Sequence, residues 1–252
     1  MMQTKKPFAY GIKNKQILFN FMLALLAASL LMVSCSKQDT VEHSGLKANT
    51  LAASFPSDGV WYGIVGPTGS NTAGDVRKDG SVYSVRNFHQ DYSGSPSFPH
   101  IGSGNFFWNF GIHEGTSDTG YDINFTGIAT GDIKTTAAIG ELRFKDKAFA
   151  SVVAADWSTA TPGDNYTIGM DSVTHDPGQP PAPPFVQAYA NGKGWYDYHW
   201  TDHSVRPVAG RTLLFKRNGT PDRYWKIEVS DIYLNNVFKG SFAYYHFKYQ
   251  EL

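Results

Sequence analysis

This sequence has very little cysteine, no excess of positive or negative charge and no long amphipathic helix pattern. Cys35 is the only cysteine among 252 residues, so the chain cannot form an internal disulfide and its fold must rest on a hydrophobic core. Basic and acidic side chains number 22 each. Proteins that bind nucleic acid neutralise phosphates with an excess of Lys and Arg, so nucleic acid is not an expected partner. We find no amphipathic pattern of three helical turns.

The motifs of common enzyme classes are also missing. The chain contains no G-x-S-x-G nucleophile elbow, no H-E-x-x-H zinc helix and no phosphate-binding loop of the G-x-x-x-x-G-K-S/T type. The run HEGTSD at 113–118 lacks a second histidine, and DVRKDGS at 75–81 lacks the alternating carboxylates of a calcium loop. We therefore expect no enzymatic activity. A pair of carboxylates for glycoside hydrolysis stays open, because such pairs meet only in the folded chain.

The N-terminus has the layout of a bacterial lipoprotein signal. Four lysines between positions 5 and 15 precede an uncharged, mostly apolar run at 17–34, and Cys35 follows at once. The setting LMVSC resembles a lipobox, with Met32 where leucine is usual. We predict a signal peptide at 1–34 and a diacylglyceryl group on Cys35. The alternative is a transmembrane anchor, because a run of 18 such residues is just long enough to span a bilayer.

The mature chain would begin with Cys35 and a short tether. Processing removes four of the lysines and no acidic residue, which leaves a net charge of −4. Residues 35–55 are mostly small and polar and predict a flexible tether between the lipid and the folded part. Residues 56–252 are enough to bury one core, and we expect a single β-rich domain there.

Strand signals dominate from position 61 onward. Aromatic and β-branched residues are frequent, several runs alternate with polar residues, and Gly and Pro punctuate them. In RYWKIEVSD, Trp225, Ile227 and Val229 would take one face, while Lys226 and Glu228 take the other. The predicted fold is all-β and predominantly antiparallel, with long loops and at most short helices. The predicted strands are 60–65, 81–88, 105–113, 121–129, 141–149, 185–190, 194–200, 212–217, 224–234 and 240–250.

Two stretches predict connections between strands. RNGTPDR at 217–223 predicts a hairpin turn in which Asn-Gly supplies positive φ and Pro221 closes the turn. THDPGQPPAPP at 174–184 contains five prolines, which remove backbone donors that a sheet needs. We expect an exposed, semi-rigid loop there. TTAAIGEL at 135–142 is the stretch that could hold a short helix.

The stretch GWYDYHWTDHSVRPVAGRTLLFKR at 194–217 combines histidines with aromatic residues. If it is extended, His199 and His203 point to the same face about 13 Å apart, so one zinc ion cannot bind both without a bend. Tyr196, Tyr198 and Trp200 would take the opposite face. The stretch can therefore offer one imidazole to a ligand while its aromatic rings pack behind it.

A flat cofactor that carries iron needs axial ligands from both sides and apolar or aromatic walls. Met170, the only methionine in the mature chain, and His175 on the proline-rich loop are the candidates for an opposite ligand. The candidates to line or back such a pocket are Trp195, Tyr198 and Trp200. For each of these residues taken alone, packing or a solvated ring is the competing interpretation.

The remaining histidines of the predicted domain point to structural roles or to none. His246 would lie on a sheet surface. His113, at the end of a predicted strand, would be a hydrogen-bonded structural residue. His89 and His100 flank a loop rich in Ser, Gly and Pro and carry no assignment.

The last third of the chain carries an ordered set of motifs. Within 194–250 the chain contains, in this order, a GWY-x-Y strand, a histidine, P-x-x-G-R, the strand TLLFKR, a strand with an aliphatic face and a final Y-x-F-x-Y-Q strand. This order resembles the HmuY family of bacterial haem-binding lipoproteins. FWNFGIH at 107–113 is similar to that family's W-D-I/L-x-F strand, with Asn109 where Asp is usual. The lipobox agrees, whereas residues 55–104 match no part of the family.

The resemblance implies an almost all-β protein that is lipid-anchored at the outer membrane, is displayed on the cell surface and grips haem between loops. Such proteins take haem from host haemoproteins and pass it to a TonB-dependent receptor for iron acquisition. One axial ligand falls between the GW and GR strands, which implies His199 or His203 here. The other comes from the preceding loop, which implies Met170 or His175.

An interaction module is the alternative to haem binding. Aromatic faces that stack on a porphyrin stack equally well on sugar rings, so a β-sandwich that binds glycan or a partner protein without iron fits the same composition. A Soret band on adding hemin separates the two hypotheses.

Overall fold

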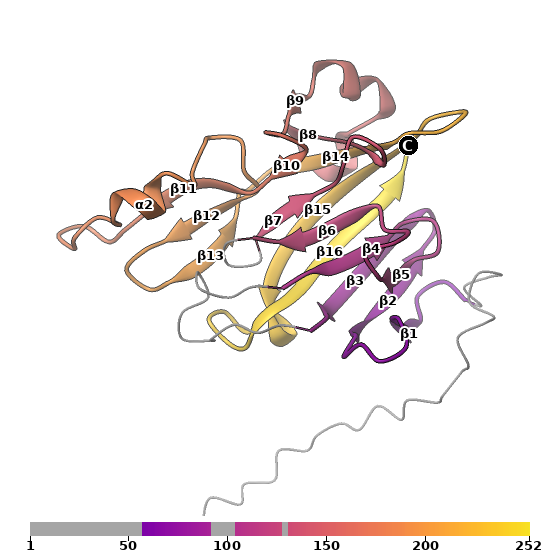
Figure 1. Ribbon diagram of the computed structural model, residues 1–252, viewed down its shortest axis with the longest axis horizontal. Coiled ribbons are helices and arrows are strands. Elements are labelled where there is room, and N and C mark those ends of the chain that lie inside the picture. The colour runs from indigo at the N-terminus through magenta and orange to yellow at the C-terminus, as the bar shows by residue number, and fades with distance from the viewer. Residues whose placement is uncertain (1–56, 92–103, 128–130) are drawn as a thin grey trace, which may run out of the picture. The chain divides into compact units, whose positions relative to one another are not determined.

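Three β-sheets make up the part of the chain that the computed structural model describes, residues 57–91, 104–127 and 131–252 (Figure 1). The all-β prediction is confirmed, and most strand pairs are antiparallel. These strands belong to one unit of the chain, Leu46–Leu252.

Several predictions concern residues outside these ranges. The signal peptide 1–34, the lipidated Cys35 and the tether 35–55 all lie outside the described residues, as does His100. Within the described ranges, no helix is both long and apolar enough to cross a membrane.

The largest sheet has eight strands in the order β1-β2-β3-β16-β15-β14-β8-β9. Its centre consists of the long strands whose apolar alternation the sequence displays, and β14, β15 and β16 follow one another as antiparallel neighbours. The strands are β1 (Trp61–Gly63), β2 (Ala73–Asp79), β3 (Val82–His89), β8 (Gly140–Asp146), β9 (Thr161–Pro162), β14 (Arg211–Arg217), β15 (Arg223–Tyr233) and β16 (Phe242–Glu251).

Two smaller sheets accompany the large one. The five-stranded sheet has the order β10-β7-β6-β4-β5, and in Figure 1 its strands β6 and β7 lie over β15 and β16. The three-stranded sheet has the order β11-β12-β13, and β11 and β12 run parallel. The strands are β4 (Phe106–Asn109), β5 (Glu114–Thr116), β6 (Ile123–Thr126), β7 (Asp132–Lys134), β10 (Thr167–Ile168), β11 (Met170–Thr174), β12 (Tyr196–His199) and β13 (Ser204–Pro207).

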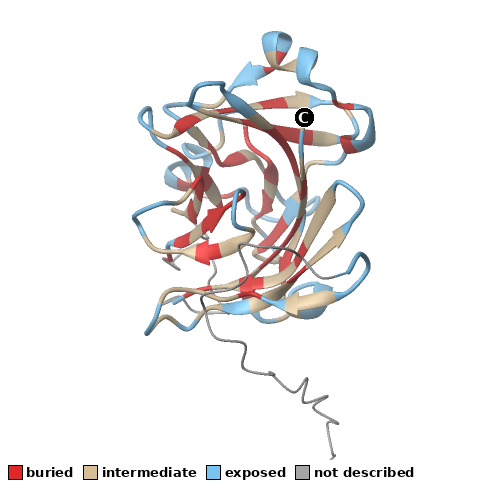
Figure 2. Cartoon of the chain, turned by 90° about the vertical axis from the view of Figure 1, so that its right-hand side faces the viewer, coloured by how far each residue is buried: buried red, intermediate tan, exposed pale blue. Residues whose placement is uncertain are grey.

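One apolar core, rich in aromatic rings, joins the three sheets. Phe88 of β3 meets Trp108 of β4 edge-on at 5.1 Å between ring centroids. Phe125 of β6 lies 4.1 Å from Tyr245 of β16. The buried residues are concentrated on the strands and the exposed ones on turns and outer edges (Figure 2). With no disulfide available within the chain, this core supplies the main stabilisation of the fold.

The outer face of the large sheet is partly covered as well. The alternation predicted in β15 is confirmed, because Trp225, Ile227 and Val229 enter the core. Lys226 on the opposite face is also buried, and its Nζ donates to the Val152 carbonyl at 3.0 Å. Two short 3₁₀ helices, η3 (Phe149–Ser151) and η4 (Ala154–Thr159), belong to the segment that covers this face. Burial therefore lowers the pKa of Lys226, and the nearby charge of Lys248 adds to the effect.

Some local predictions were wrong. The segment predicted as a strand at 185–190 begins with the short helix α2 (Pro184–Gln187), with proline in the first turn, where its missing N–H costs nothing. The segment 135–142 contains a turn rather than a helix and then enters β8. Strand β2 was not predicted from the sequence, because the run AGDVRKD has a single buried residue and little apolar alternation.

The predicted connections hold in outline. The strands β14 and β15 form the expected hairpin, with Arg217 paired to Arg223. The Asn-Gly mechanism was wrong, since neither Asn218 nor Gly219 has positive φ and the loop contains a cis bond between Thr220 and Pro221. Instead, the Asn218 amide donates to the Ala137 carbonyl at 2.9 Å. The proline-rich stretch is largely an exposed loop, as predicted.

Candidate functional site

Three histidines lie on adjacent segments at one end of the three-stranded sheet, and we call His175, His199 and His203 the histidine end. In the parallel pair β11–β12, Thr174 lies opposite His199. The Trp200 amide donates to the Thr174 carbonyl at 2.7 Å, which continues the alignment beyond the strands. Parallel strands end at the same edge of a sheet, so the proline-rich loop and the β12–β13 turn leave the sheet side by side.

His199 connects the two segments. Its ring is buried, and its Nδ1 lies 3.0 Å from Asp202 Oδ1 in the turn. Its Nε2 lies 3.3 Å from Asp176 Oδ1 in the proline-rich loop. Both ring nitrogens therefore face carboxylates, and His199 holds the loop against the turn.

Asp202 is the anionic centre of the turn. Burial opposes its ionisation, but hydrogen bonds from the Ser204 hydroxyl and amide and the charges of His199 and Arg206 outweigh burial and lower the pKa of Asp202 to about 2. It also accepts from the Arg206 guanidinium at 3.0 Å. The turn is therefore a fixed, charged structure at neutral pH.

His203 sits at the tip of the turn with a left-handed backbone, φ 55°, which is uncommon for a residue other than glycine. Its Nδ1 lies 2.8 Å from the Tyr198 hydroxyl, and its ring meets Trp200 edge-on at 5.1 Å. Burial raises the pKa of Tyr198, so its hydroxyl keeps its proton at neutral pH. A bond to one ring nitrogen is the usual device by which proteins orient an imidazole whose other nitrogen binds a metal.

The other sequence candidates are divided between this end and the core. His175 is exposed on the loop, and Trp200 is half-buried beside the histidines. Tyr198 is a core residue whose hydroxyl contacts His203. Trp195 is also in the core, but it precedes Tyr196 at the far end of β12, where its amide donates to the Gly169 carbonyl at 2.8 Å, so the prediction that it backs the site was wrong.

Met170 is also in the core and pairs with Tyr196 at the opposite end of β11. The structure therefore places the segments that carry the three histidines side by side and leaves Met170 apart from them. His203 does not share a face with His199 as predicted, because β12 ends at His199 and the turn that follows sets His203 against Tyr198 and Trp200.

A loop after β15, residues 235–240, flanks the histidine end and was not predicted as part of the site from the sequence. Lys239 Nζ lies 3.8 Å from Asp202 Oδ2, and the Arg206 guanidinium lies 5.7 Å from the centre of the Phe238 ring. The side chains of Val237 and Phe238 are 60% and 53% exposed. The signal that could have revealed this loop is NNVFKG at 235–240, where an apolar pair interrupts a polar turn.

These residues could contact a haem group, but they offer too few ligands for a bare metal ion. Among the described residues, no group of three or more His, Cys, Asp or Glu side chains is arranged to hold a metal. Haem iron takes four ligands from the porphyrin and needs only one or two from the protein. The imidazoles could coordinate its iron, and the exposed Phe238 could contact its apolar ring. The cations Arg206 and Lys239 could bind its propionates.

The remaining histidines have structural roles. His113 Nδ1 lies 2.8 Å from the Tyr249 hydroxyl, which confirms a hydrogen-bonded structural residue. The prediction for His246 was wrong, because its ring is buried and its Nε2 lies 2.9 Å from the Tyr233 carbonyl oxygen. His89 Nδ1 lies 2.8 Å from the Ala243 carbonyl oxygen.

Comparisons of the chain with models of protein families, with curated proteins and with solved structures gave no match. The functional assignment therefore rests on the residues of this chain.

Proposed function

We propose that this protein is a lipid-anchored, HmuY-like binder of haem or a related porphyrin that performs no chemistry on its ligand. The observation that carries the proposal is the histidine end, where His175, His199 and His203 come from two adjacent segments beside Trp200. Haem binding needs imidazoles near aromatic surface at an accessible edge, and this end supplies both.

His203 is the preferred axial ligand. Its Nδ1 is engaged by the Tyr198 hydroxyl at 2.8 Å, so Nε2 is the atom that would coordinate iron. His175 is the preferred opposite ligand, because it is exposed on the neighbouring loop. His199 would coordinate iron only after Asp176, whose side chain is 57% exposed, moves away from it.

Arg206 and Lys239 are the proposed partners of the haem propionates. Both cations lie at the β12–β13 turn, within 3.8 Å of Asp202. A charge-assisted bond to a carboxylate is the interaction that guanidinium and ammonium groups make best. Phe238 and Val237 would cover part of the porphyrin ring, which accounts for an exposed apolar pair on a polar loop.

The cellular role follows from the anchor and the resemblance. Cys35 would hold the protein at the outer membrane, on the cell surface, through its lipid. From there it would take haem from host haemoproteins and deliver it to a TonB-dependent receptor, so that the protein serves iron acquisition in the manner of a haemophore.

A titration of hemin into the purified mature chain tests the proposal. We expect a saturable Soret band at one equivalent with low-spin visible bands. The substitutions His203→Ala and His175→Ala should each remove the low-spin bands, and His199→Ala and Met170→Ala complete the ligand set. The matched control is His89→Ala, a half-buried histidine on β3 that should leave the spectrum unchanged. Featureless absorbance that never saturates would reject haem binding and favour the interaction module.

A further inference from the structure

A cavity lies at the opposite end of β15 from the histidine end. Tyr233, the last residue of β15, accepts a hydrogen bond from the Val205 amide beside the histidines, whereas Arg223, the first residue, lines the cavity. The turn between β4 and β5 covers the ends of β2, β3, β15 and β16 there, and together they enclose about 360 Å³. That volume falls in the range of small-molecule sites.

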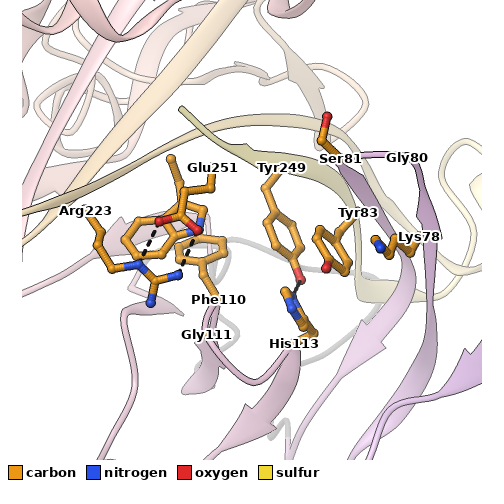
Figure 3. Close-up of a pocket in the computed structure, with 11 residues that line it drawn as sticks. Lys78, Gly80, Ser81, Tyr83, Phe110, Gly111, His113, Arg223, Tyr249 and Glu251 are labelled. Carbon is orange, nitrogen blue, oxygen red and sulfur yellow. Dashed lines mark hydrogen bonds and ion pairs between the residues drawn. The ribbon is translucent and has the colours of Figure 1, made fainter. Parts of the chain in front are cut away.

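Aromatic rings form one wall of this cavity. Tyr83 and His113 stack at 3.8 Å between ring centroids with their planes 14° apart. The Tyr249 ring is also nearly parallel to Tyr83, at 5.2 Å and 11°. Behind them, Phe110 and Trp225 stack on each other at 5.6 Å. Figure 3 shows the rings of Tyr83, His113 and Tyr249 on one side of the view and the Arg223–Glu251 pair on the other.

The charges around the cavity are compensated. The Arg223 guanidinium binds both carboxylate oxygens of Glu251, each at 2.7 Å. Lys78 Nζ lies 3.8 Å from Asp58 Oδ1. Burial and the nearby charges of Arg223 and Lys78 lower the pKa of His113 to about 4, so its ring is neutral at pH 7. The cavity therefore offers donors and acceptors together but no excess of one charge.

We infer that this cavity binds a neutral sugar ring. Sugar hydroxyls both donate and accept hydrogen bonds, and a guanidinium beside a carboxylate offers donors and acceptors side by side. The C–H faces of a sugar carry small positive charge and are attracted to the negative faces of aromatic rings. Each of the two cations of the cavity has its own acidic partner, so the cavity carries no excess positive charge that would favour an anionic ligand over a neutral one.

This inference does not depend on the haem proposal. The two sites share β15 but lie at its two ends, so the loss of one should leave the other intact. The sugar could be free or the terminus of a longer glycan, because a cavity of this size accepts a terminal ring in either case.

Calorimetric titration of the full purified chain with sugars tests the inference. The probes are glucose, galactose, N-acetylglucosamine and the anionic galacturonate, each up to millimolar concentration. We expect saturable binding of at least one neutral sugar. Binding of galacturonate alone would overturn the assignment to neutral sugars, and no binding of any probe would overturn the site itself. A longer oligosaccharide ending in the bound sugar then separates free sugars from glycan termini.

Two substitutions locate the binding in the cavity. Glu251→Gln keeps the shape of the side chain and removes a charged acceptor, so affinity should fall about tenfold. Tyr83→Ala removes part of the aromatic wall and should weaken binding at least as much. The control is Glu228→Gln, because Glu228 also pairs across β15 and β16, with Lys248 at 2.8 Å, but does not line the cavity. Equal losses in Glu228→Gln and Glu251→Gln would place the binding elsewhere.

Discussion

At the residue scale, Glu114 is a carboxyl group whose environment opposes its charge. It is largely buried at the start of β5, where its Oε2 accepts a hydrogen bond from the Val65 amide. Burial raises its pKa from 4.5 to about 8, and the bond from Val65 offsets only part of that effect. Glu114 therefore stays protonated in the folded protein at neutral pH, whereas the unfolded chain ionises it.

Glu114→Gln should stabilise the protein at neutral pH. Between pH 4.5 and 8 the folded state binds more protons at this position than the unfolded state, so the contribution of Glu114 to stability falls as pH rises. Glutamine keeps the acceptor and cannot ionise, and the free energy of unfolding at pH 7 should rise by about 2 kcal/mol. Urea unfolding of both proteins at pH 4.5 and pH 7 measures this. A gain of the same size at both pH values would contradict the mechanism.

Tyr198→Phe tests the orientation of His203. Removing the hydroxyl deletes the 2.8 Å bond to His203 Nδ1 but keeps the aromatic ring in the core. If His203 is an axial ligand, hemin affinity should fall roughly 10- to 100-fold, as when other hydrogen-bond partners of metal-binding imidazoles are removed. The dissociation constant from the Soret titration gives the result. Tyr196→Phe, on the same strand, is the control and should keep wild-type affinity.

At the element scale, Arg211 joins the three-stranded sheet to the large one. Its Nε lies 2.7 Å from Asp146 Oδ1 on β8, and its Nη1 binds both Asp171 of β11 and the Gly194 carbonyl before β12. The side chain is mostly buried. One guanidinium therefore connects β14, β8 and the parallel pair that positions the histidine end.

Arg211→Ala should loosen this connection and leave the partly buried Asp171 without its cation. We expect the free energy of unfolding to fall by about 2 kcal/mol, less than for a fully buried pair. Arg211→Lys keeps the charge but not the forked geometry and should lose less. Urea unfolding ranks the three proteins. If Arg211→Lys lost as much as Arg211→Ala, the charge would contribute little and the fork would be the essential feature.

At the scale of the whole molecule, contact between sheets supplies the stability that disulfides supply elsewhere. Phe125 is fully buried between the five-stranded sheet and β16. Phe125→Ala should cost about 3–5 kcal/mol of unfolding free energy, because it removes a large apolar side chain and leaves a cavity. Phe185→Ala is the matched control, because that ring is 65% exposed. It should change stability by less than about 0.5 kcal/mol. Similar losses in both proteins would contradict this account of the core.

The sequence by itself determined the fold class, the β14–β15 hairpin, the exposed proline-rich loop and the hydrogen-bonded character of His113. These features depend on local periodicity and on residues near one another in the chain. Prediction from the sequence failed at 185–190, where a short helix that begins with proline resembles a short apolar strand. It also failed at β2, whose apolar pattern is weak. The predictions about the lipid anchor and haem remain predictions.

Only the tertiary structure decided which side chains meet. The parallel pairing of β11 with β12 places the segment of His175 beside the end of β12 at His199 and sets Met170 at the other end, although the sequence offered Met170 and His175 as equal candidates. The cavity near Arg223 joins residues from both ends of the domain, from Lys78 to Glu251. Such contacts depend on strand register and sheet packing between distant segments, and no local pattern in a single sequence encodes them.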